Sequence, residues 1–128
     1  MPAEAAVIFE RDKKMTLYDL RKADFAFEDA VSAYAETVRI GAACGVDLNL
    51  IETMNDSYET KAAVIAVKEN CDLPVIVTNA YEKNGRTFTG CTPASMAHTL
   101  TALGADAIGL NCSMGPDDVY PIIKTIAE

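Results

Sequence analysis

Cys112 carries the most reactive side chain at a position where a strand is expected to end. It follows Asn111, and both come directly after an apolar run over residues 105–110. A turn at residues 114–116 comes next. Polar residues at the carboxyl end of a strand, just before a loop, are where α/β enzymes hold their chemistry. A cysteine in such a place can act as a nucleophile or as a soft metal ligand, in both cases as the thiolate.

Neither role is complete in the sequence around Cys112. Covalent catalysis by cysteine usually needs a histidine partner, and the only histidine, His98, falls inside a predicted helix, away from the strand end. We interpret His98 as a helix-surface residue. A zinc site needs three or four ligands, and the pattern places a single cysteine here together with carboxylates. From the residues alone, a buried strand-end thiol explains Cys112 at least as well as a functional one.

A second polar strand end occurs earlier in the chain, at Glu52. Residues 45–53 and 104–112 both begin with Gly-x-Asp and have the same length, so that Glu52 aligns with Asn111 and Thr53 with Cys112. A carboxylate at the end of an apolar strand is costly unless a cation or a ligand meets it. Parallel strands bring their carboxyl ends to one rim, so we expect Glu52, Asn111 and Cys112 to cluster, with Asn79 from the strand between them.

The elements that would position these residues alternate along the chain. Apolar spacing predicts helices over residues 24–42, from Asn55 or Asp56 to 66, over 92–103 and over 117–127, with Asp24 and Thr92 as N-caps. Strands are predicted over residues 48–53, 75–79 and 105–110, and a short one is expected at 5–9. Alternating strands and helices predict a parallel sheet with right-handed crossovers. The uniformly apolar strands indicate a sheet covered on both faces.

Composition sets the outer limits of the interpretation. The chain has 128 residues, enough for one domain but about half of the roughly 250 residues in a full (β/α)₈ barrel. The net charge of −8 argues against a nucleic-acid partner and against an anionic membrane. Without an apolar run of ~20 residues or a signal-peptide pattern, we expect a cytoplasmic protein. Its four cysteines should be free thiols, with Cys44 and Cys71 as small apolar residues near helix ends.

Three separated segments resemble the homocysteine S-methyltransferase family, namely residues 50–64, 84–90 and 108–116. The sequence is most similar to the homocysteine-binding barrel of cobalamin-dependent methionine synthase. The resemblance covers about residues 25–128, whereas residues 1–24 match poorly. It implies a single α/β domain over residues 1–128: a partial TIM (β/α)₈ barrel of three to four consecutive βα units with parallel strands, from the middle of the barrel.

The resemblance also implies roles for the rim residues. Cys112 matches the position of one of three zinc ligands, Glu52 matches the residue that binds the amino group of homocysteine, and Asn111 would support the site. In such enzymes zinc lowers the pKa of the homocysteine thiol, and the thiolate takes a methyl group from methylcobalamin, the donor of the full-length family enzyme that the sequence resembles, or from another donor.

The departures from the family pattern lead to two further expectations. The adjacent cysteine pair that supplies the other two zinc ligands is absent from this sequence, so we expect the chain alone to be inactive. A non-catalytic α/β module used for self-assembly or small-molecule binding is the alternative function. Three or four βα units would leave open sheet edges, which favours self-association, for example as a dimer that continues the sheet.

Overall fold

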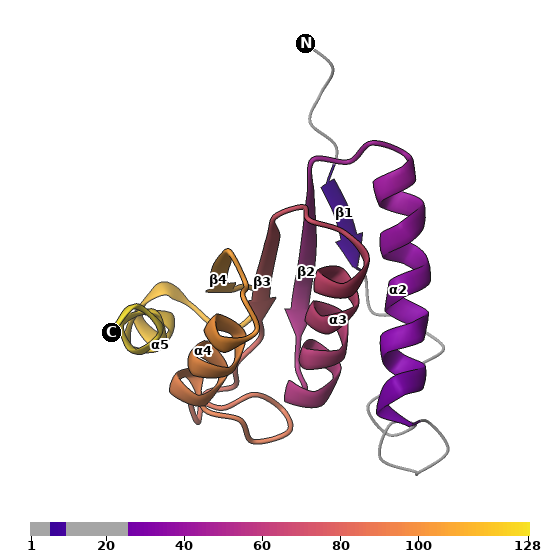
Figure 1. Cartoon of the computed structure of the whole chain (residues 1–128). Coiled ribbons are helices and arrows are strands. Elements are labelled where there is room, and N and C mark those ends of the chain that lie inside the picture. The colour runs from indigo at the N-terminus through magenta and orange to yellow at the C-terminus, as the bar shows by residue number, and fades with distance from the viewer. Residues whose placement is uncertain (1–5, 10–25) are drawn as a thin grey trace.

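A four-stranded parallel sheet forms the centre of the structure, a computed structural model that describes residues 6–9 and 26–128 (Figure 1). Its strands are β1 (Ala6–Phe9), β2 (Leu48–Met54), β3 (Val75–Asn79) and β4 (Ala107–Leu110), and they lie side by side in chain order. All three strand pairs are parallel. The predicted parallel α/β sheet is confirmed. The short strand expected near the N-terminus is also present, over Ala6–Phe9.

Four helices alternate with the strands in the described part of the chain: α2 (Phe27–Ala43), α3 (Ser57–Asn70), α4 (Pro93–Ala102) and α5 (Pro116–Ala127). Of the two N-cap candidates for α3, the structure selects Asp56, whose Oδ1 accepts hydrogen bonds from the backbone N–H groups of Tyr58 and Glu59 at 2.8 and 3.0 Å. Thr92 caps α4 as predicted, with its hydroxyl oxygen 3.2 Å from the backbone nitrogen of Ser95. These caps satisfy helix N–H groups that have no partner within the helix.

Three predicted boundaries are wrong by two residues or more, one of them the end of α3, which continues to Asn70 rather than to residue 66. The N-cap of α2 is Ala26 rather than Asp24, which itself lies outside the described residues. The cap is made from inside the helix, because the Asp29 carboxylate accepts the backbone N–H of Ala26 at 3.2 Å. The last strand begins at Ala107 rather than at Ala105. Asp106 ends the connection before it, and its carboxylate accepts the N–H of Val75 at 2.8 Å.

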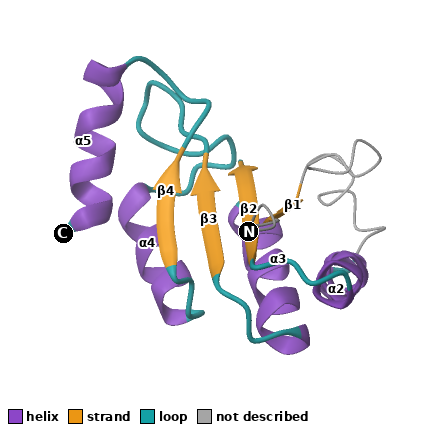
Figure 2. Ribbon diagram, turned by 90° about the horizontal axis from the view of Figure 1, so that it is seen from above, coloured by secondary structure: helices purple, strands orange, loops and turns teal. Residues whose placement is uncertain are grey.

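The hydrophobic core lies between the helices and one face of the sheet. Figures 1 and 2 show α3 and α4 on the same side of the strands. Ile51 and Val77 point into this core and are fully buried. Their neighbours on the opposite face, Leu50 and Ile76, are only half-buried, because successive side chains of a strand alternate between the two faces. The expectation of two covered faces therefore holds for only one face among the described residues.

The four cysteines are free thiols, as predicted. Cys71 is half-buried and accepts a hydrogen bond from Asn49 Nδ2 at 3.4 Å. Cys44 is exposed, so its interpretation as apolar filler is wrong: it forms the C-cap of α2, where its side chain faces solvent. Within residues 6–9 and 26–128, no helix has the length and apolarity needed to cross a membrane.

Candidate functional site

A β-bulge at the end of β2 positions the first site residue, Glu52. Ile51 pairs with Val77 and Met54 pairs with Asn79, so Glu52 and Thr53 together face the single residue between Val77 and Asn79. The extra residue bends the strand end and redirects its side chains, as bulges near functional sites commonly do. Glu52 follows the buried Ile51 and therefore lies on the sheet face away from α3 and α4, where it is half-buried.

Asn111 connects the end of β4 to the end of β2. Its side-chain Nδ2 lies 3.2 Å from Glu52 Oε1 and 2.7 Å from Thr53 Oγ1. Strand β3 lies between β2 and β4 in the sheet, so this side chain crosses over the end of β3. The backbone of Asn111 continues the β3–β4 ladder, because its N–H donates to the carbonyl of Asn79 at 3.3 Å. Asn111 therefore joins three strand ends.

Cys112 follows on the exposed side of this cluster. Its backbone has a φ of 47°, a left-handed conformation that is uncommon for a residue other than glycine. Its Sγ lies 3.5 Å from Asn111 Nδ2. The next residue, Ser113, fixes the turn: its hydroxyl donates to the carbonyl of Asn111 at 3.0 Å and accepts the N–H of Tyr81 at 2.9 Å.

The structure brings together three of the four rim residues predicted to cluster. Glu52, Asn111 and Cys112 are linked through the Asn111 amide. The side chain of Asn79 is the exception. It is fully buried on the helix side of the sheet, where its Nδ2 lies 3.3 Å from the Met54 carbonyl and 3.4 Å from Thr60 Oγ1. Asn79 lies on the same face of β3 as the buried Val75 and Val77, because successive side chains of a strand alternate between the two faces.

His98 lies on the exposed surface of α4, as predicted. Its ring Nδ1 lies 2.7 Å from the carbonyl oxygen of Ala94, one turn earlier in the same helix. No hydrogen bond or ion pair in the described structure joins it to the rim cluster. The interpretation of His98 as a helix-surface residue is confirmed by its exposure on α4.

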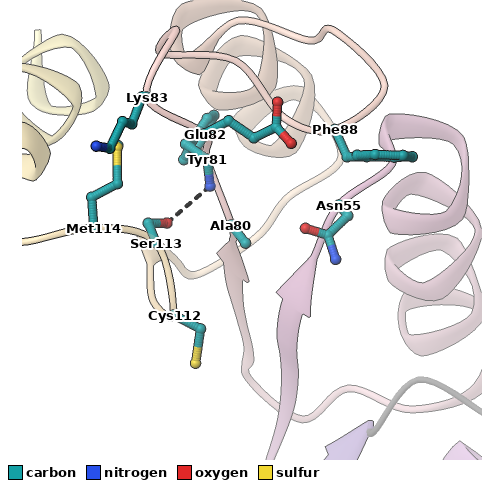
Figure 3. Close-up of a pocket in the computed structure, with 9 residues that line it drawn as sticks. All are labelled: Asn55, Ala80, Tyr81, Glu82, Lys83, Phe88, Cys112, Ser113 and Met114. Atoms are coloured by element: carbon teal, nitrogen blue, oxygen red, sulfur yellow. Dashed lines mark hydrogen bonds between the residues drawn. The ribbon is translucent and has the colours of Figure 1, made fainter.

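A pocket of about 520 Å³ opens beside Cys112 (Figure 3). It is bounded by the loop after β3 on one side and by the loop after β4 on the other. In the view of Figure 3, Lys83 and Met114 lie at one end and Phe88 and Asn55 at the other. Its lining residues are Asn55, Ala80, Tyr81, Glu82, Lys83, Phe88, Cys112, Ser113 and Met114.

The loop after β3 supplies pocket residues that sequence reasoning missed. Its Asn84-Gly85 turn was recognisable, but no sequence pattern indicated that Phe88 would be 66% exposed beside the pocket. Tyr81 is buried at the base of the loop, and its hydroxyl has no hydrogen-bond partner in the described structure. Burial, followed by the nearby Cys91, raises the pKa of Tyr81 to about 12. Tyr81 is thus a neutral wall of the pocket at physiological pH.

The described residues do not form a complete zinc site. No group of three His, Cys, Asp or Glu side chains within residues 6–9 and 26–128 lies close enough together to hold a metal ion. Structural and catalytic zinc sites use at least three protein ligands. At the rim, Cys112 is the single sulfur donor, and Glu52 is engaged by Asn111. The donors among the described residues therefore do not fit a zinc ion.

The fold and its rim define a parallel α/β protein that carries polar side chains at the carboxyl ends of its strands. The family model described as homocysteine S-methyltransferase matches residues 5–128. Because this match spans nearly the whole sequence, the chain belongs to the homocysteine S-methyltransferase family. The resemblance seen in three sequence segments is thereby confirmed, and the match includes residues 5–24, which were expected to match poorly.

A solved structure agrees with this assignment at the level of the fold. The chain is similar to the apo form of the homocysteine methyltransferase MmuM from Escherichia coli, with a TM-score of 0.68 and 14% sequence identity over 80% of this chain. The match covers 39% of the MmuM chain, so this protein spans well under half the length of that structure. At this identity the likeness establishes the fold, a partial TIM-barrel-like arrangement of consecutive βα units.

Proposed function

We propose that this chain supplies part of the homocysteine-binding site for methyl transfer to homocysteine, which would give methionine. The observation that carries the proposal is the contact of Asn111 Nδ2 with Glu52 Oε1 at 3.2 Å, in a protein of the homocysteine S-methyltransferase family. This contact holds a carboxylate at the open rim of the sheet. Glu52 would bind the ammonium group of homocysteine, and Asn111 would keep the carboxylate oriented.

The chemistry of the rim supports an amino-acid ligand. A half-buried carboxylate gains most from a cation that brings its own hydrogen-bond donors, and an α-ammonium group is such a cation. The neighbouring pocket combines the apolar Phe88 and Met114 with the charged Lys83 and Glu82. Such a lining suits a short zwitterionic amino acid with a thiol side chain, since it offers apolar surface as well as both signs of charge.

The reaction is a substitution at a methyl carbon. The thiol of homocysteine gives its proton to water, its sulfur forms a bond to the methyl carbon, and the bond from that carbon to the donor breaks, with the electron pair leaving on the donor. Methylcobalamin as donor stays a prediction from the family resemblance. We propose Cys112 as one zinc ligand, whose companions would come from outside the described residues. The chain by itself should therefore bind homocysteine weakly and show no turnover.

Homocysteine titration followed by calorimetry tests the substrate role. We expect saturable binding by the wild-type chain and a loss of about fivefold to tenfold in affinity in Glu52→Gln, because the charge that pairs with the ammonium is removed. Glu36→Gln, at an exposed position of α2, is the matched control and should bind as the wild type does. Equal affinity in Glu52→Gln and Glu36→Gln would contradict the proposal.

Zinc analysis tests the metal role separately. Both Cys112 and Cys44 are exposed, so Cys112→Ser and Cys44→Ser make a matched pair. If Cys112 is a ligand, zinc that co-purifies with the chain or is added to it should be lost in Cys112→Ser and retained in Cys44→Ser. If the wild-type chain holds zinc, equal and undiminished zinc content in the two variants would remove Cys112 from the proposed ligand set without affecting the substrate role of Glu52.

A non-catalytic assembly module is the second candidate, favoured by the exposed edge of the sheet. Strand β4 is the last strand of the described sheet, and Ala107 at its start is exposed. Unpaired edge strands tend to pair with another chain. We propose that a second copy of this chain pairs there. Light scattering should give a mass above one chain; a folded sample with the mass of a single chain would contradict self-association.

A further inference from the structure

We propose that Thr53 is a positioning residue that fixes the Asn111 amide, so that one remaining amide hydrogen is shared between Glu52 and Cys112. The inference deepens the proposed function, because it concerns the same rim, but its first test does not depend on that function. It starts from the hydrogen bonds around Asn111 Nδ2, which lies 2.7 Å from Thr53 Oγ1, 3.2 Å from Glu52 Oε1 and 3.5 Å from Cys112 Sγ.

Thr53 is held in place by its own backbone. The bulge takes its N–H out of the regular β2–β3 ladder, and the hydroxyl oxygen of Thr78 accepts this N–H at 3.1 Å instead. The φ of Thr53 is 60°, a left-handed conformation that is rare for a β-branched residue. Conformations of this kind persist only where the surroundings fix them, and they concentrate at functional sites. Thr78 therefore secures Thr53, and Thr53 in turn presents its hydroxyl to Asn111.

The Asn111 side-chain amide has fewer hydrogens than it has acceptors within reach. A side-chain NH₂ group has two hydrogens, whereas Asn111 Nδ2 has three acceptors within reach. The Thr53 contact is the shortest of the three, so it takes one hydrogen. The second hydrogen can serve either the Glu52 carboxylate or the Cys112 sulfur. The Asn111 amide therefore links the Glu52 carboxylate to the Cys112 thiol.

The NMR signals of the Asn111 side-chain amide in the full chain report on this group directly. A change in overall stability alone does not shift them. Asn111→Leu identifies these signals. Thr53→Val keeps the shape of the side chain and removes the hydroxyl, so the two amide hydrogens should shift and broaden as the group reorients. Thr53→Ser should restore wild-type positions. Thr99→Val, which removes a hydroxyl bonded 2.8 Å from the Ser95 carbonyl within α4, is the matched control and should leave them unchanged.

Unchanged Asn111 signals in a folded Thr53→Val chain would overturn the proposal. If Thr53→Val does not fold, Thr78→Val should produce the same shift, because the Thr53 backbone loses its acceptor, and unchanged signals there would be equally decisive against it. Homocysteine binding is the second arm: affinity should fall about fivefold in Thr53→Val, as for one net hydrogen bond, and recover in Thr53→Ser. Absence of binding by the wild type would contradict the proposed function, while the NMR result would still decide the role of Thr53.

Discussion

Thr53 and Cys112 occupy equivalent places at the ends of two strands, and both have left-handed backbones, with φ values of 60° and 47°. The segments that lead to them share a Gly-x-Asp start and the same length. In each case the residue just before the left-handed one, Glu52 or Asn111, takes part in the rim hydrogen bonds. The repeated backbone conformation thus delivers the two side chains that meet across β3.

The left-handed conformation of Cys112 should cost stability that glycine recovers. An L-residue in this region costs about 1–2 kcal/mol, part of which is offset by the greater chain entropy of glycine. We expect Cys112→Gly to be more stable than Cys112→Ala by roughly 0.5–1 kcal/mol. The measurement is the free energy of unfolding in urea for both variants.

The control for this comparison is an exposed helical position. Thr37 lies in α2 and faces solvent. There the order should reverse, with Thr37→Ala more stable than Thr37→Gly by about 1 kcal/mol, because glycine is the poorer helix former. If Cys112→Gly proved less stable than Cys112→Ala, as at Thr37, the left-handed backbone would carry no strain.

The Glu52–Asn111 contact should appear as a coupling energy. We expect the single variants Glu52→Ala and Asn111→Ala and the double variant to give a coupling of about 1 kcal/mol in unfolding free energy, the size of a net hydrogen bond to a partly exposed carboxylate. Pairing Glu52→Ala with Asn70→Ala is the control. Asn70 ends α3, just before β3 begins, and its side chain accepts a hydrogen bond from Arg39 rather than from a rim residue, so its coupling to Glu52 should be near zero. A zero value for Glu52 and Asn111 as well would mean that their contact adds nothing to stability.

Local sequence signals predicted the fold and three of the residues that meet at the rim, Glu52, Asn111 and Cys112. Thr92 followed by Pro93 located the start of α4, and the repeated Gly-x-Asp segments aligned Glu52 with Asn111. Such signals act within a few residues, or through the strict alternation of parallel units. The same alternation placed His98 on the outer surface. These parts of the structure depend on short-range physics that a single sequence carries.

The bulge in β2 could not be predicted in this way. It depends on Thr78 of the neighbouring strand, whose hydroxyl replaces a ladder partner for Thr53. That contact joins residues far apart in sequence, and no turn or composition signal accompanies it. The bulge turns Thr53 toward Asn111, whereas Asn79 faces the core because it alternates with Val75 and Val77 along β3. The lining of the pocket by Phe88 was missed for a similar reason, since loop side chains follow tertiary contacts rather than periodicity.

Asp106 should stabilise the sheet only while it is ionised. The backbone N–H of Val75, and next the Lys68 side chain at 3.3 Å, hold the pKa of Asp106 below its ordinary value. A carboxyl whose pKa is lower in the folded state contributes stability above its unfolded pKa and loses it as the pH falls through the folded pKa. Asp106→Asn should therefore lower Tm at neutral pH, and the difference from the wild type should shrink on acidification. Thermal melts across this range measure the effect.

Asp72→Asn is the control for Asp106. Asp72 lies exposed in the short loop between α3 and β3, and its replacement should leave Tm close to the wild-type value throughout. A Tm deficit in Asp106→Asn that persisted unchanged into strong acid would show that the carboxylate charge is not the source of its contribution.

Tyr81 should make the protein sensitive to alkali. Its pKa is raised from 10.0 to about 12, first by burial and then by Cys91, so between these values the unfolded chain ionises while the folded chain does not. A group with a raised folded pKa loses its stabilising effect as the pH rises through this interval, here by roughly 2–3 kcal/mol in total.

Tyr81→Phe removes the ionisation, so its unfolding free energy should fall less than that of the wild type between pH 10 and 12. At neutral pH it should equal or exceed the wild-type value, because the buried hydroxyl has no partner in the described structure. Urea unfolding at several alkaline pH values measures both effects. Tyr58→Phe, at a position 65% exposed, should keep the alkaline sensitivity of the wild type, and parallel curves for Tyr81→Phe and Tyr58→Phe would contradict the assignment to Tyr81.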